Sequence, residues 1–134
     1  MEHISIFMQG VNHFLFGEAR FLHLLIYVIA IDIVLGMLKG IKLHSFKSSY
    51  SIEGFAKKFG MIVLVMLANI MAQIMPEISW IVAGTIIFLI ANEIGSIIEN
   101  LSLLGVPIPE FITEKLAVLR NTAVDKDGRV KNNR

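Results

Sequence analysis

Two carboxylates lie within apolar stretches of the sequence, where charged side chains are rare. Glu93 follows Asn92 in the run IFLIANEIGSIIENL, and Asp32 lies in FLHLLIYVIAIDIVLGML. In a membrane-spanning helix each acid would cost roughly 2.5–3.5 kcal/mol near the centre, and such acids usually face a bundle interior or water. There a carboxylate can carry a proton or a cation, or it can join a polar contact between helices. The role of Asp32 and Glu93 therefore depends on the secondary-structure elements in which they lie.

The composition indicates a membrane protein. The 134 residues are 55% hydrophobic and 17% charged, with a mean hydropathy of +0.71. A soluble domain of this size cannot bury so much apolar surface in one small core, so we expect a lipid bilayer as the solvent. The net charge of +1 provides no basic field for nucleic acid. The chain has no cysteine for disulfides or thiolate metal sites.

Three apolar segments are long enough, or nearly so, to cross a bilayer: residues 21–39, 60–75 and 78–98. A spanning helix needs about 20 residues, and only helices satisfy the backbone in lipid at these lengths. The second segment is short unless its helix begins near Phe55 and the following lysines extend to the interface. The sequence therefore predicts an all-α integral membrane protein with three transmembrane helices.

Turn residues and charge predict the arrangement of these spans. Pro76 and Glu77 leave room only for a tight turn, so the last two spans form an antiparallel hairpin. The predicted loop at residues 40–59 and the tail at residues 99–134 are rich in Lys and Arg. By the positive-inside rule both are cytoplasmic, which places the N-terminus outside and the C-terminus inside.

The two ends of the chain predict helices outside the spans. In residues 1–20, apolar side chains recur at three- and four-residue spacing, which is typical of an amphipathic helix. Its polar face lacks Lys and Arg, so we expect it either on the outer leaflet or against partner helices. In the tail, Pro109 and Glu110 suit the first turn of a short helix that ends near Arg120. The polar residues from Asp125 onward are expected to be disordered.

Asp32 and Glu93 are predicted to share one layer of the membrane. Asp32 lies six residues before Leu38, near the end of the first span, and Glu93 lies five residues before the end of the third. With a rise of about 1.5 Å per residue, both acids lie roughly 8–9 Å inside the cytoplasmic boundary. We therefore expect a cluster of acids and lysines there, within one subunit or between subunits. The lysines at this face are Lys39, Lys57 and Lys58. Alternatively, each acid draws in water at the interface or is neutral.

The third span combines a polar stripe with small residues. The predicted intramembrane polar contacts, which would line a pore or join subunits, are Asp32, Thr85, Asn92, Glu93, Ser96 and Glu99. Small residues permit close helix approach, and those predicted to pack are Gly36, Gly40, Ala68, Ala72, Gly84, Ala91 and Gly95. Three helices make a thin bundle, so further copies of the chain are expected to hide the stripe or to surround water with it. Packing within one monomer is the alternative.

Motifs of common enzymes and metal sites are not found in the sequence. There is no Walker loop and no HExxH motif, and the four histidines lie in different segments. Ser48 and Ser49 have no nearby His/Asp pair, so a loop or helix-cap role is favoured over catalysis. We expect no enzymatic activity, no cofactor and no metal.

Two motifs in order resemble the toxin-secretion/phage-lysis holin family. In DIVLGMLKGIKLHSFKSSYSIEGFAKKFG the matching positions are Asp32, Gly36, Lys39, Ser48, Ser49, Gly54, Lys57 and Lys58. In NEIGSIIENLSLLGVPIPEFITEKLAVL they are Asn92, Glu93, Ser96, Glu99, Asn100, Gly105, Pro107 and Pro109. The resemblance covers residues 32–119, and the first twenty residues carry no matching motif.

The resemblance implies a phage or prophage protein of the bacterial inner membrane. Such a protein oligomerises and forms lesions that release a cytoplasmic endolysin, or in some relatives a toxin. The expected partners are further copies of the chain, the lipid bilayer and an endolysin, with an antiholin as an additional candidate. Nucleic acid is not expected.

Three other functions are open at this point. An antiholin shares the fold of a holin. A small ion or multidrug transporter would use a membrane acid for a proton or a cationic substrate, but it usually needs a carboxylate near mid-membrane and four spans. A membrane anchor would hold a cytoplasmic partner through the tail helix.

Overall fold

The computed structural model describes residues 1–17, 19–45 and 48–125. These residues are organised in five α-helices and one short 3₁₀ helix. In chain order they are α1 (Glu2–Phe16), α2 (Leu22–Lys42), α3 (Ser48–Ile74), η1 (Pro76–Ile78), α4 (Trp80–Leu103) and α5 (Glu110–Asp125). The predicted all-α class is confirmed for the described part of the chain.

Three of these segments are long and apolar enough to cross a membrane, as predicted: Leu22–Lys42, Ile52–Ile74 and Pro76–Leu103. Their bounds differ from the expected ones, because much of the segment expected as a loop, residues 40–59, is helical. That segment contains no proline, and lysine is a good helix former, so its positive charge does not end a helix.

The helix α4 is central to the bundle. It packs against α2, α3 and α5, whereas α2 and α3 make little direct contact with each other. η1 reverses the chain between α3 and α4, so these two helices are antiparallel. The carboxyl ends of α2 and α4 lie together, because Lys42 Nζ donates to the carbonyl oxygen of Leu104 at 3.0 Å. α2 and α4 are therefore parallel.

The apolar core lies between the three long helices, toward the end where α2 begins. Its buried residues are Leu25, Met61, Val65, Ile86 and Leu89. Phe16, the last residue of α1, and Ala19, in the connection to α2, pack against it. Only 11–22% of the most apolar stretch of each spanning helix is buried within the monomer. Most of each helix surface is therefore left for lipid or for other protein chains.

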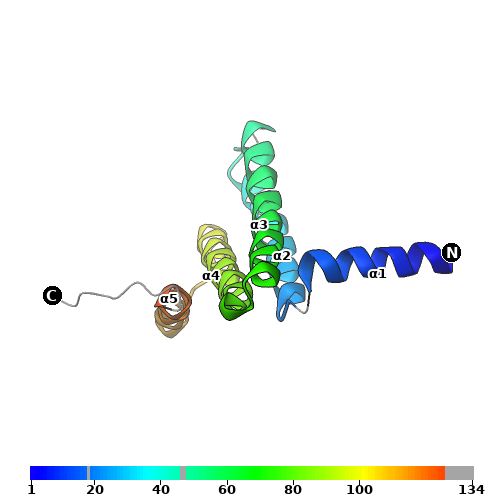
Figure 1. The fold of residues 1–134 in the computed structure, drawn as a ribbon. Coiled ribbons are helices and arrows are strands. Elements are labelled where there is room, and N and C mark those ends of the chain that lie inside the picture. The colour runs from blue at the N-terminus through cyan, green and yellow to red at the C-terminus, as the bar shows by residue number, and fades with distance from the viewer. Residues whose placement is uncertain (18, 46–47, 126–134) are drawn as a thin grey trace.

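The first and last helices lie outside this three-helix bundle. α1 projects sideways from it, crosswise to α3 (Figure 1). α5 packs against α4, and a Cβ atom built at Gly95 would lie 3.7 Å from Cδ2 of Leu116. The helix in the tail continues to Asp125, beyond the expected end near Arg120. Most of the segment expected to be disordered lies outside the described residues.

Candidate functional site

Side chains from all three long helices meet in one charged cluster, formed by Asp32, Lys58, Glu93 and Asn100. Lys58 Nζ on α3 lies 2.5 Å from Asp32 Oδ2 on α2, and it also pairs with Glu93 Oε2 on α4. Asn100 Nδ2 donates a hydrogen bond of 2.9 Å to the other carboxylate oxygen of Asp32. Because one ammonium group reaches both acids, Asp32 and Glu93 lie in the same layer of the bundle.

The cluster is buried although it is charged. Glu93 is 2% exposed, Asn100 6% and Asp32 7%. Removing charges from water is costly unless they are paired and their remaining hydrogen-bonding capacity is met. In the described part of the chain, every buried side-chain nitrogen and oxygen has a hydrogen-bond partner. With both acids ionised and Lys58 protonated, the cluster holds two negative charges and one positive charge.

Helical periodicity explains why these side chains point inward. On α3, Lys58 precedes the buried Met61 and Val65 by three and seven residues, so it continues their stripe. On α4, Glu93 follows the buried Ile86 by seven residues. The charged layer is therefore an extension of the apolar core, on the side of the bundle away from α1.

The three lysines expected near the acids occupy different environments. Lys58 forms both ion pairs, whereas Lys57 is exposed. Lys39 is half-buried and lines a cavity beside the cluster. The structure therefore brings one of the three lysines into contact with the acids, and it does so within a single chain.

The cavity separates α2 from α3 at the charged end of the bundle. Its volume is about 830 Å³. The polar residues that line it are Asp32, Lys39, Ser45, Lys58, Ser96 and Asn100, and the glycines are Gly36, Gly40 and Gly54. At this end of the bundle, the space lies between α2 and α3, which make little direct contact.

The expected polar stripe of α4 is only partly enclosed. Thr85, Asn92 and Ser96 are half-buried, and Glu99 is exposed. Asn100, which binds Asp32, was absent from the stripe predicted by spacing and appeared only in the family resemblance. The signal that identifies it is its position four residues after Ser96, which itself lies four residues after Asn92.

The small residues lie in different environments. Ala68, Gly84 and Ala91 are buried inside the monomer, and Gly95 packs near α5. Ala72 is half-buried. Gly36 behaves differently, because a Cβ atom added there would meet nothing within 4 Å. Packing within the monomer therefore does not require a glycine at position 36.

A sequence profile of the bacteriophage holin family matches residues 10–121. The chain belongs to the bacteriophage holin family. The match includes all four residues of the charged cluster and all three spanning helices. The expected family resemblance is therefore confirmed.

Individual relatives agree with this assignment. The chain is 35% identical over 114 residues to a probable holin of Bacillus phage phi105, which covers 85% of this chain and 84% of the relative. It is 28% identical over 128 residues to the holin-like protein TcdE of Clostridioides difficile, covering 82% and 76%. An uncharacterized protein of Bacillus subtilis, YqxH, is 35% identical over 126 residues, covering 90% of each chain. No solved structure shows significant similarity to the chain.

Proposed function

We propose that the chain is a holin that oligomerises in the bacterial inner membrane and forms lesions. The lesions release a cytoplasmic endolysin, or a toxin, and the protein itself has no enzymatic activity. The observation that carries this proposal is the family match over residues 10–121, which includes the whole spanning bundle. In this membrane the N-terminus lies outside and the C-terminus inside, because the lysines of α2 and α3 lie at the end of the bundle opposite α1.

The charged cluster suits a protein that is dormant before it assembles. Inside one monomer, Lys58 pairs with both acids, so a single copy can reside in the bilayer without exposing these two carboxylates to lipid. The cavity beside the cluster gives α2 and α3 room to move relative to each other. In the lesion, Asp32 and Glu93 face water or a neighbouring subunit.

Inducible expression in bacteria tests the proposal. The chain is produced together with a cytoplasmic muralytic enzyme that lacks an export signal, and turbidity is followed with a membrane-potential dye. Abrupt lysis after a delay, together with depolarisation, is the expected result. Depolarisation without lysis would instead indicate a small channel or transporter. Continued growth with intact potential would favour an antiholin or an anchor.

The adjacent lysines of α3 provide a matched pair of variants for the same assay. Lys58→Met removes the cation of the cluster, whereas Lys57→Met removes an exposed charge one residue away. We expect Lys58→Met to change the lysis time or prevent accumulation, because it leaves two buried acids side by side. Lys57→Met is expected to follow the parental schedule. Equal lysis times for both variants, at equal protein levels, would show that the charged cluster does not affect lesion formation.

A further inference from the structure

The helix α1 presents an apolar face that the other described helices leave largely uncovered. Ile4, Phe7, Met8 and Phe14 are each 59–68% exposed. These side chains share one face with Val11 and Leu15, because their spacing follows the helical repeat. Ser5, Gln9, Asn12 and His13 lie on the remaining surface, and all are exposed.

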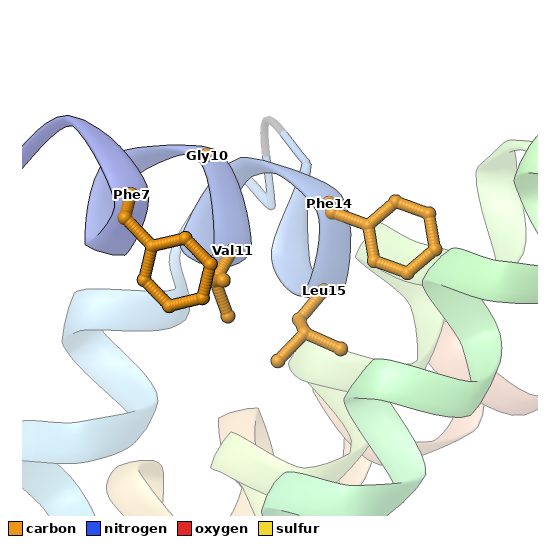
Figure 2. A pocket seen from close by; sticks show the side chains of 5 residues that line it. All are labelled: Phe7, Gly10, Val11, Phe14 and Leu15. Atoms are coloured by element: carbon orange, nitrogen blue, oxygen red, sulfur yellow. The ribbon is translucent and has the colours of Figure 1, made fainter.

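A shallow apolar hollow runs along this face. It is lined by Phe7, Gly10, Val11, Phe14 and Leu15. Figure 2 shows Phe7, Val11 and Leu15 on the same side of α1, whereas the ring of Phe14 extends along the helix toward the green ribbons of the bundle. A Cβ atom at Gly10 would meet nothing within 4 Å, so the hollow is open. None of the described residues lines it with a polar side chain, so it suits apolar contents.

The position of α1 is fixed by its last turn. Asn69 and Gln73 of α3 both donate hydrogen bonds to the carbonyl oxygen of Phe14, at 3.0 and 2.9 Å. These two residues lie in the last two turns of α3. α1 is therefore held at the end of the spanning bundle, opposite the charged cluster.

The apolar face points toward the side on which the spanning helices run. In Figure 2 the side chains of Phe7, Val11 and Leu15 point from α1 toward the side where the ribbons of the bundle lie. α1 runs crosswise to the spanning helices at one end of the bundle and projects beyond it (Figure 1). The part of α1 that projects beyond the bundle therefore has lipid, not protein, on the side of its apolar face. Its apolar face then meets acyl chains and its polar face meets water.

We propose that α1 lies in the interface of the bilayer, opposite the basic end of the bundle, with its apolar face among the acyl chains. The apolar side chains and the hollow that they line take the acyl chains of one leaflet. Within Glu2–Phe16 there is no Lys or Arg, so attraction to anionic headgroups does not hold it there. Its attachment is apolar and therefore independent of salt and of headgroup charge. This proposal rests on membrane insertion of the three spans and is independent of lesion formation.

Spin labelling of single-cysteine variants tests the placement of α1. The chain contains no cysteine, so one labelled site is unambiguous. Ile4→Cys, Phe7→Cys and Phe14→Cys place labels on the apolar face, and Ser5→Cys, Gln9→Cys and Asn12→Cys are matched positions on the polar face. All six positions are exposed, so labels do not disturb the core. The full chain is reconstituted in bilayers of phosphatidylethanolamine and phosphatidylglycerol, and collisions with oxygen and with a water-soluble nickel chelate are measured.

We expect labels on the apolar face to favour oxygen over nickel, and labels on the polar face to show the reverse. The ratio should alternate along α1 with the helical repeat and stay unchanged in high salt. Labels on the apolar face could instead be shielded from both reagents and show spin–spin broadening that disappears on dilution with unlabelled protein. That result would show that a second copy of the chain covers the apolar face. Uniform access to nickel would place α1 in water, and uniform exclusion of nickel would make it a fourth span. Each of these three results would overturn the proposal, and none depends on lysis.

Discussion

The most unusual residue in the structure is Lys58, because two buried carboxylates share its single ammonium group. Neutralising one acid leaves a balanced pair of one acid and one lysine. Neutralising both acids leaves a half-buried ammonium group without a counter-charge, which is more costly. The two acids should therefore be partly redundant in stabilising the bundle.

This redundancy predicts a non-additive pair of substitutions. We expect Asp32→Asn or Glu93→Gln alone to lower the free energy of unfolding modestly, because each amide retains an oxygen that can accept a hydrogen bond. The double variant should lose about 3–5 kcal/mol, since Lys58 is then uncompensated. Denaturant titration of the detergent-solubilised protein measures the single and double changes and their coupling.

Glu99→Gln is the control for this cycle, because Glu99 lies on the same helix as Glu93 but is exposed. It should change stability by less than about 0.5 kcal/mol. Strictly additive effects of Asp32→Asn and Glu93→Gln would contradict the shared-lysine arrangement.

Counting residues from the ends of the spans predicted that Asp32 and Glu93 lie at one depth. The same counting did not show whether Lys57 or Lys58 pairs with the acids, because the answer depends on the rotation of α3 about its axis. The rotation is decided by tertiary packing of Met61 and Val65, which periodicity alone does not identify in a helix that is apolar on most sides. The role of these residues in pores or subunit contacts stays a prediction.

At the scale of elements, the junction between α1 and α3 depends on Gly17. Its φ of +54° and ψ of −137° lie in a region that side chains rarely adopt, and a Cβ atom there would lie 2.6 Å from Asn69 Oδ1. Asn69 is also the residue that donates to the carbonyl oxygen of Phe14. One glycine therefore both turns the chain and leaves room for the side chain that anchors α1.

We expect Gly17→Ala to destabilise this junction by about 1–3 kcal/mol, through backbone strain and displacement of Asn69. Gly10→Ala is the matched control inside α1, where an added Cβ meets nothing. It should stabilise the helix by up to about 1 kcal/mol, because alanine is the better helix former. The motion of a spin label attached at Asn12→Cys measures how firmly α1 is held. We expect the label to move faster in the Gly17→Ala background and to keep its motion in the Gly10→Ala background. Equal label motion in both backgrounds would argue against a fixed junction.

The existence of the helices was easier to predict than their ends. Length and hydropathy identified three spans, because the bilayer imposes both. The loop predicted at residues 40–59 is shorter, since positive charge indicates the side of the membrane but not the end of a helix. The packing of α5 against α4 also depends on tertiary contact, which its modest apolar stripe did not reveal.

For the whole molecule, the cavity between α2 and α3 leaves small residues without partners. Gly36 lines this cavity, and a Cβ atom added to it meets nothing within 4 Å. If the proposed assembly forms, a side chain of a neighbouring copy can enter this space. Stability of the monomer and assembly of the oligomer then have different requirements at position 36.

Gly36→Ala should separate these two properties. We expect monomer helicity to be kept or raised, whereas assembly weakens by about 1–3 kcal/mol per overpacked contact. Chemical crosslinking in membranes and the lysis delay report the assembly. Gly60→Ala is the control, because a Cβ atom there also meets nothing and Gly60 does not line the cavity. Equal crosslinking and equal delays for both variants would place the subunit contact elsewhere.

The sharing of Lys58 also has a consequence for how the chain enters a membrane during synthesis. Asp32 emerges from the ribosome first, and its cation follows 26 residues later. Once α2 and α3 have both emerged, they carry a neutral pair, before Glu93 is made 35 residues after Lys58. Asp32 therefore has no partner until Lys58 on α3 has been synthesised, which favours insertion of α2 and α3 together. The second acid arrives last, on the helix that contacts both of the others, so α4 completes the bundle.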